Sequence, residues 1–206
     1  MKKKTLLIAV AAIALAVITA ASVTVAWLTA ESNQVTNTFT YGEIALELWE
    51  NPLDSNGNFD TSVKNETGLT FEKIVPGDVV KKNPTVTVKE GSEKCFVYVL
   101  VTNKLISDAE KPTAPVATLS INENWEEVYT TGNSVLYRYT TDPQNPGDYL
   151  VFETVTFNTA LTLDDVVAMK DNINNIVIKA YAHQSDNTNM DTADTAAIAW
   201  ANTNAN

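Results

Sequence analysis

The side chains that most often carry chemistry are few in this sequence and widely spaced. His183 is the only histidine. A zinc peptidase needs two or three ligands and a nearby general base, typically as His-Glu-x-x-His on a helix, so that arrangement is impossible here. The serines near His183 also lack the Gly-x-Ser-x-Gly setting of a serine hydrolase. We expect His183, at the end of an apolar run, to be a half-buried strand residue rather than a base or a ligand.

Two pairs of neighbouring carboxylates, Asp164-Asp165 and Glu126-Glu127, could in principle serve a glycoside hydrolase. Adjacent residues of a helix or strand point in different directions, so neither pair shares one site by itself. We therefore expect solvated acidic faces, no catalytic residues and no enzymatic activity. The chain has 7 glycines and no glycine-rich phosphate loop, so no cofactor is expected.

A polar loop between residues 51 and 60 superficially resembles a calcium site. Oxygen-bearing side chains stand at alternate positions: Asp54, Asn56, Asn58 and Asp60. An EF-hand loop has glycine at its sixth position and glutamate at its twelfth, whereas here Gly57 is fourth and Asn65 twelfth. A polar hairpin without metal ligands is the favoured interpretation, and calcium is the alternative that the acidity of the chain leaves open.

The first 28 residues have the pattern of an export signal. Three lysines precede an uncharged, largely apolar run from Thr5 to Leu28. The best small-residue cleavage site is Thr24-Val25-Ala26, which predicts a signal peptide over residues 1–26 and a cut between Ala26 and Trp27. A cut after Ala21 is the rival site, and a retained membrane anchor is the alternative to cleavage. Each of these places the remaining chain outside the cytoplasm.

Composition limits what the exported part can bind. After the leader, 11 basic residues face 25 acidic ones, a net charge of −14. Such a charge repels nucleic acid and anionic membranes, so contact with a membrane is expected only through the leader. About 180 residues are enough for one domain with a substantial core. Cys95 is the only cysteine and lies in an apolar run, so we expect a buried small hydrophobic residue and no disulfide.

Short β-rich segments separated by turn residues predict an all-β fold over residues 27–206, an antiparallel jelly-roll-like β-sandwich. One short helix is expected where Thr162 and Asp165 form a capping-box arrangement, ending near Asn172. The tail over 185–206 is expected to be loose or weakly helical, with Trp200 as its one large anchor. Strands are expected over residues 35–50, 85–89, 95–103, 116–121, 125–130, 134–141, 149–157 and 176–183.

Several stretches, taken in order, resemble the TasA/camelysin family of exported bacterial proteins. They are the lysine-rich leader, the junction 25–29 (VAWLT), the strand 39–47 (FTYGEIALE), the segment 74–80 (IVPGDVV), and the ending 178–184 (IKAYAHQ) with Ala199-Trp200. The resemblance implies a leader cut by a SipW-type signal peptidase and a jelly-roll subunit of extracellular fibres in a biofilm matrix or on the cell surface. The implied partners are other copies of the chain and other matrix or cell-wall proteins.

In fibres of that family an N-terminal segment completes the sheet of the next subunit, which is strand addition. The matching positions here are residues 27–40, which carry no charge from Ser32 onward. Val35 and Phe39 are four residues apart, so in a strand they point to one side and could fill core pockets of a neighbour. The alternatives are a flexible exported N-terminus or an edge strand of the protein's own fold.

Two other functions compete with the fibre subunit. A monomeric surface-binding module or adhesin would recognise carbohydrate through exposed Trp49, Trp125 or Tyr149, although buried core aromatics are commoner. An unconventional metallopeptidase, as described for camelysin-type relatives, would have to use His183 and Asp186. Because this sequence departs from any conventional metal motif, peptidase activity is not carried over from the resemblance.

Overall fold

The computed structural model describes residues 43–71, 74–103, 116–162 and 176–205. The chain divides into two units, residues 1–40 and 41–206, and every described residue belongs to the second. The expected leader, the Ala26–Trp27 cleavage site, the segment 27–40 with Val35 and Phe39, and the helix expected after Thr162 lie outside the described residues. Within the described ranges, no helix is long and apolar enough to cross a membrane.

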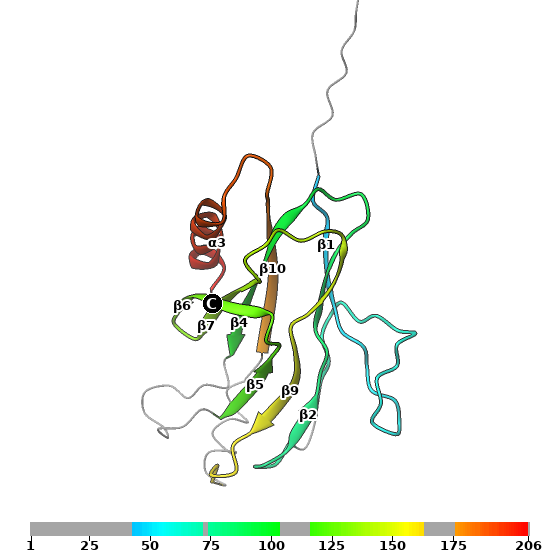
Figure 1. Ribbon diagram of the computed structural model, residues 1–206. Helices are drawn as coiled ribbons and strands as arrows, with labels where there is room; N and C mark the ends of the chain where they lie inside the picture. The colour runs from blue at the N-terminus through cyan, green and yellow to red at the C-terminus, as the bar shows by residue number, and fades with distance from the viewer. Residues whose placement is uncertain (1–42, 72–73, 104–115, 163–175, 206) are drawn as a thin grey trace, which may run out of the picture. The chain divides into compact units, whose positions relative to one another are not determined.

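The described residues form ten antiparallel strands in three sheets and one C-terminal helix (Figure 1). The strands are β1 (Leu46–Trp49), β2 (Val79–Lys81), β3 (Thr85–Val88), β4 (Cys95–Asn103), β5 (Ala117–Ile121), β6 (Trp125–Thr131), β7 (Ser134–Tyr139), β8 (Gly147–Leu150), β9 (Phe152–Phe157) and β10 (Ile176–Gln184), and the helix is α3 (Met190–Asn204). The predicted β-rich, antiparallel character of the chain is confirmed.

The sheets have the strand orders β1-β3-β8, β2-β9-β5 and β10-β4-β7-β6. Main-chain hydrogen bonds continue between the first two sheets, because the Lys82 N–H donates to the Glu153 C=O at 2.8 Å and the Val151 N–H to the Pro84 C=O at 2.8 Å. These two three-stranded sheets therefore follow one another in a single layer, and the four-stranded sheet forms the other. Valines dominate the core between the layers, joined by Phe152, Phe157 and Trp125.

Strand β4 is the centre of the four-stranded sheet, and all nine of its residues are buried. Its sequence is a nearly continuous apolar run, which is typical of a strand covered on both faces. Val97, Val99 and Val101 point into the core between the layers. Phe96, Tyr98 and Leu100 point to the opposite face, where they pack against α3. The sequence prediction of this strand, from Cys95 to Asn103, is confirmed in full.

The expectation of a loose or weakly helical tail is wrong for residues 190–204, which form the helix α3. Asn189 caps the helix by accepting a hydrogen bond from the Thr192 N–H at 2.9 Å. Ala193, Ala197 and Ala201 recur every four residues on one face and are fully buried against the sheet. Small side chains at this spacing let the helix lie close to the sheet, and this packing outweighs the weak helix propensity of the exposed Asn, Thr and Asp residues.

Other predicted elements differ in their boundaries. Residues 149–157 were expected to form one strand, but β8 and β9 divide at Val151, whose N–H bonds to Pro84 instead of continuing one ladder. In the described part of the predicted strand 35–50, only Leu46–Trp49 is a strand. The turn predicted at residues 76–78 is present: Gly77 has φ +90°, and the Asp78 N–H bonds to the Val75 C=O at 3.1 Å.

Candidate assembly surface

The only histidine is a half-buried strand residue, as predicted. His183 lies on β10, is half-buried, and its Nδ1 is 3.0 Å from the Tyr181 hydroxyl. Asp186 is exposed in the turn that follows β10. No group of three or more His, Cys, Asp or Glu side chains in the described ranges is placed to hold a metal ion. The two residues named for an unconventional metallopeptidase therefore form no metal centre with other described side chains of these types.

The two adjacent glutamates on β6 form hydrogen bonds with nearby side chains. Glu126 accepts a hydrogen bond from Arg138 Nη2 at 2.7 Å, and Glu127 accepts one from the Thr130 hydroxyl at 2.8 Å. The two carboxylates thus have different partners, as expected of adjacent strand residues. The other pair, Asp164-Asp165, lies outside the described residues.

The polar loop at residues 51–60 is the predicted hairpin. Leu53 and Phe59 form an antiparallel bridge across it. The Asp54 carboxylate accepts hydrogen bonds from the Asn58 N–H at 2.9 Å and the Asn56 N–H at 2.8 Å. These bonds favour the charged form and lower the pKa of Asp54. The carboxylate therefore orders its own turn, as in other Asx turns.

The aromatic residues considered for carbohydrate binding are buried or half-buried and contact other parts of the fold. Trp125 is buried, and its indole N–H donates to the Leu150 C=O at 2.7 Å. Tyr149 is also buried. The half-buried Trp49 donates its indole N–H to the Thr87 hydroxyl at 2.7 Å, and Lys64 Nζ lies 4.0 Å from the ring centroid. None of these three rings is an exposed stacking surface.

Cys95 is buried without exposed area, as predicted. Burial disfavours the thiolate and raises the pKa of Cys95 to about 11. A thiol with this pKa is protonated at neutral pH, so it behaves as a small hydrophobic side chain rather than as a nucleophile.

The unusual surface of the molecule is the free edge of β10. In the described part of the chain, β10 pairs only with β4, through nine consecutive residue pairs without a register shift. Beyond its end, the Ser185 N–H donates to the Lys94 C=O at 3.0 Å. Because antiparallel ladders alternate, the odd-numbered residues of β10 bond to β4 and the even-numbered ones point outward. The N–H and C=O groups of Ile178, Ala180 and Ala182 therefore face the free edge.

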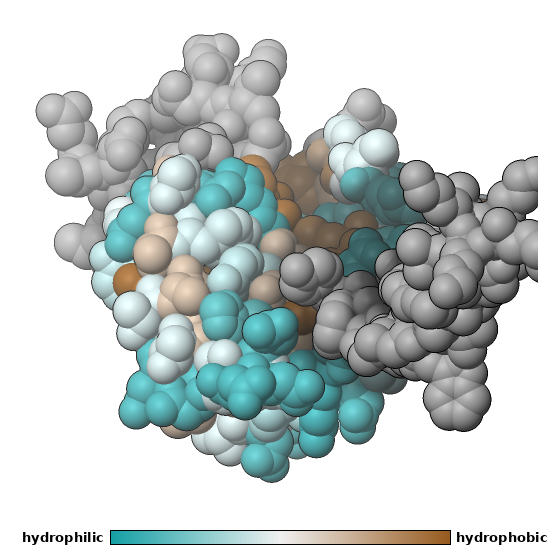
Figure 2. Space-filling view, turned by 90° about the horizontal axis from the view of Figure 1, so that it is seen from above, coloured by the Kyte–Doolittle hydropathy of each residue, from teal (hydrophilic) through white to brown (hydrophobic). Residues whose placement is uncertain are grey.

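Strand β1 is an edge of the facing layer and lies close to β10. The Lys89 N–H donates to the Ala45 C=O at 2.9 Å, so the same alternation turns the main-chain groups of Leu46 and Leu48 outward. We call the region between these two edges the seam. Its core-facing apolar residues are only half-buried: Ile44, Leu46, Leu48, Ile176, Ile178, Ala180 and Ala182. In Figure 2, hydrophobic atoms of the described surface gather in a hollow with hydrophilic surroundings.

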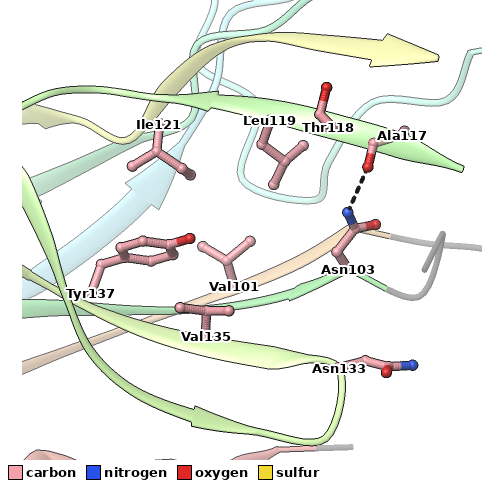
Figure 3. Close-up of a pocket in the computed structure, with 9 residues that line it drawn as sticks. All are labelled: Val101, Asn103, Ala117, Thr118, Leu119, Ile121, Asn133, Val135 and Tyr137. Atoms are coloured by element: carbon pink, nitrogen blue, oxygen red, sulfur yellow. Dashed lines mark hydrogen bonds between the residues drawn. The ribbon is translucent and has the colours of Figure 1, made fainter. Parts of the chain in front are cut away.

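An open cleft of about 290 Å³ lies between β5 and the facing strands β4 and β7 (Figure 3). Leu119 and Ile121 line one wall, and Val101, Val135 and Tyr137 line the other. Asn103 lies at one end, where its Nδ2 donates to the Ala117 C=O at 3.3 Å. The cleft is therefore an apolar space at the end of β4, with amide groups at its rim.

The outer face of the four-stranded sheet is closed by α3. Arg138 on β7 is buried and donates to Asp194 on the helix at 2.5 Å, while Tyr98 donates its hydroxyl to the same carboxylate at 2.7 Å. Burial acts to lower the pKa of Arg138, but its hydrogen bonds to Asp194 and Glu126 outweigh this effect and raise it. Trp200 stacks on Tyr181 of β10 with 5.2 Å between ring centroids. Trp200 thus packs on the outer face of β10, and the apolar side chains of its other face pack against the core.

No protein-family model, no curated protein and no solved structure matches the chain. The sequence predicts a strand over residues 176–183 but not its place at an edge. Edge position depends on contacts between residues far apart in the sequence. The alternation of apolar residues in β10 predicts which face of the strand is buried, but not which strand pairs with it. These apolar residues are Ile176, Ile178, Ala180 and Ala182. The cleft was likewise not predicted, since residues of three separate strands form it.

Proposed function

We propose that this protein is a secreted structural subunit of an extracellular fibre or matrix, which assembles when residues 27–40 of one copy, the arm, add a strand to β10 of the next. The observation that carries the proposal is the edge of β10, a strand of nine residues in unbroken register. Its even-numbered residues direct their main-chain groups outward, and its core-facing apolar side chains are half-buried. Such an edge is a ready template for pairing with another chain. The added strand completes a jelly roll of two facing layers.

The sequence of the arm suits this edge. Its even-numbered residues from 32 to 40 are Ser32, Gln34, Thr36, Thr38 and Thr40, all polar. Its odd-numbered residues from 33 to 39 are Asn33, Val35, Asn37 and Phe39, which include both large apolar side chains of this stretch. Residues paired directly across two strands have side chains on the same face, and the outward main-chain groups of β10 belong to residues whose side chains face the core. An arm that runs parallel to β10, with its odd-numbered residues opposite Ile178, Ala180 and Ala182, bonds to them through its even-numbered residues. It places Val35 and Phe39 on the core-facing side, with Asn37 between them, and leaves the hydroxyls in solvent.

The magnitudes show that side chains are needed as well as main-chain bonds. Pairing at three residues makes up to six hydrogen bonds, each contributing about 0.5–1.5 kcal/mol net. Burying Val35 and Phe39 adds roughly 1.5–3 kcal/mol each. Association costs about 4–15 kcal/mol in lost freedom, so the main-chain bonds alone leave little net affinity. Substitution of the two apolar side chains is therefore expected to stop assembly.

In this proposal, cleavage between Ala26 and Trp27 by a SipW-type peptidase frees the arm, and other matrix or cell-wall proteins are further partners. Membership of the TasA/camelysin family stays a prediction from the leader and the strand segments. The acidic surface keeps subunits soluble before they pair. The proposal includes no catalytic residue and no cofactor.

The test compares chains purified from Trp27 onward and from Tyr41 onward by electron microscopy and size-exclusion chromatography. We expect fibres from the first and folded monomers from the second. A full-length mature chain with Val35→Asp and Phe39→Asp is the matched variant, because it keeps the arm and removes its apolar face. Val35→Ile with Phe39→Leu is the control and is expected to assemble. Monomers from the unmodified mature chain across pH and salt, together with binding to glycans, would instead favour a surface-binding module.

A further inference from the structure

We propose that Trp27, the first residue of the arm after cleavage, inserts its indole ring into the cleft between β5 and β7 of the neighbouring copy. This inference rests on the proposed strand addition and specifies where the arm ends. In this arrangement β10 holds the middle of the arm through the main chain, and the cleft holds its tip through one large side chain.

The position of the cleft favours this occupant. Asn103 and Val101, which line it, are the register partners of Ile176 and Ile178 at the first end of β10. The cleft thus lies one strand in from the Ile176 end of the edge on which the arm pairs. Trp27 precedes Val35 by eight residues, which span roughly 27 Å in an extended strand. An arm that runs parallel to β10 therefore has enough chain to pass the Ile176 end and turn into the cleft.

The size and lining of the cleft match one aromatic side chain. Its volume of about 290 Å³ lies at the lower limit of pockets for drug-sized molecules, roughly 300–1,000 Å³. Leu119, Ile121, Val101 and Val135 supply apolar walls, and the Tyr137 ring offers an edge or face to a second ring. Indole combines a large apolar surface with one N–H donor, and the amide groups of Asn103 and Asn133 lie at the rim.

The arm offers only one suitable side chain for this site. Its aromatic residues are Trp27 and Phe39. Phe39 shares a face with Val35, and together they pair along β10 in the proposed register. Trp27 lies outside that register, at the end that the peptidase releases. An aromatic anchor in a desolvated pocket is the usual form of an energetic hot spot.

The experiment maps the neighbours of residue 27 inside assembled material. The mature chain carries the photo-crosslinker benzoylphenylalanine at position 27, and is mixed with isotopically heavy unmodified subunits so that crosslinks between copies are recognised by mass. We expect crosslinks from the light chain to heavy peptides that contain Leu119, Val135 or Tyr137. The same crosslinker at Thr38, on the polar face of the arm, is the control and should not reach these residues.

A second measurement compares the critical concentration for assembly of Trp27→Ala and Trp27→Phe chains, in which every residue of the described fold is kept. We expect an increase of about tenfold or more for alanine and a smaller one for phenylalanine. Fibres with an unchanged critical concentration, or crosslinks only outside the cleft, overturn the placement of Trp27 and leave strand addition intact. Absence of assembly by the unmodified chain overturns both proposals, so the two failures are distinguishable.

Discussion

Strands β10 and β6 are the two edges of the same four-stranded sheet, and they differ in almost every property that governs pairing. Strand β6 has a register shift between Glu127 and Tyr129, and both Glu126 and Glu127 are exposed on it. Strand β10 is two residues longer, keeps its register throughout and carries one central charge, Lys179. Bulges and exposed charges are devices that keep an edge from pairing with another chain.

The difference between the two edges agrees with the proposal that β10, not β6, accepts the arm. The same helix, α3, covers the outer face near both edges, since Tyr129 of β6 bonds to Asn202 at 3.1 Å and Lys179 of β10 bonds to the Asn204 C=O at 2.8 Å. Coverage by the helix therefore does not explain why one edge is blunted and the other is not. A regular apolar edge that the fold leaves half-buried is instead what strand addition requires.

The largest expected effect comes from placing proline at matched positions on the two edges. The Ala180 N–H points away from β4, as described above. On β6, the Thr140 N–H donates to the Asn124 C=O, so Asn124 faces β7. Because facing and outward residues alternate, the Glu127 N–H points away from β7. Ala180→Pro and Glu127→Pro each remove an outward donor without removing a ladder hydrogen bond. We expect Ala180→Pro to abolish fibres seen by electron microscopy and Glu127→Pro to leave them.

Ala180→Ser, which keeps the N–H, controls for the change of side chain and should assemble. Circular dichroism and chemical unfolding establish that all three variants fold. Fibres from a folded Ala180→Pro chain would show that β10 is not the acceptor. Loss of fibres with Glu127→Pro alone would transfer the proposal to β6.

This comparison also shows what a sequence can and cannot predict. The apolar run of β4 is covered on both faces, so local pattern and tertiary environment agree and the predicted strand is correct. The tail was misjudged because its decisive residues are alanines, whose burial at every fourth position depends on the sheet opposite. The break between β8 and β9 at Val151 could not be predicted, because no Gly or Pro stands there in the sequence. Edge position and the cleft arise only when distant strands are paired.

A second prediction concerns the ion pair that ties α3 to the β6 side of the sheet. Asp194→Ala leaves Arg138, whose side chain is 7% exposed, without its bond to the helix and leaves the Tyr98 hydroxyl without its acceptor. Breaking a buried pair by removing one partner costs about 3–5 kcal/mol. We expect a loss near the lower value in urea unfolding, because Glu126 still pairs with Arg138.

Asp191→Ala on the same helix is the matched control for this measurement. Asp191 is exposed in the first turn, so its removal should cost only the roughly 0.3–1 kcal/mol of a helix-dipole interaction. Equal losses in the two variants would show that the Arg138 contact contributes nothing beyond helix propensity.

The smallest expected effect is a loss of folding stability at alkaline pH, which compares a titrating group near β10 with one near β6. Cys95 pairs with Gln184 at the end of β10, and its pKa rises from the ordinary 9.0 to about 11 in the fold. Above pH 9 the unfolded chain releases the Cys95 proton, whereas the folded chain keeps it. The contribution of the protonated thiol to the free energy of unfolding is therefore complete below pH 9 and is lost as pH rises toward 11. The full loss corresponds to roughly 2–3 kcal/mol.

On the β6 side the titrating group is Tyr137, opposite Glu127, whose pKa is raised by burial and then by that carboxylate. Its contribution to stability falls as pH rises through 10, the ordinary tyrosine value. Tyr98, Tyr149 and Tyr181 also have raised pKa values, so both chains lose stability as pH rises through 10. Urea unfolding under reducing conditions should therefore show a steeper decline between pH 9 and 10 in the unmodified chain than in Cys95→Ala, whose baseline is lower because of the cavity. Equal slopes in the two chains would mean that the fold does not hold the Cys95 thiol protonated.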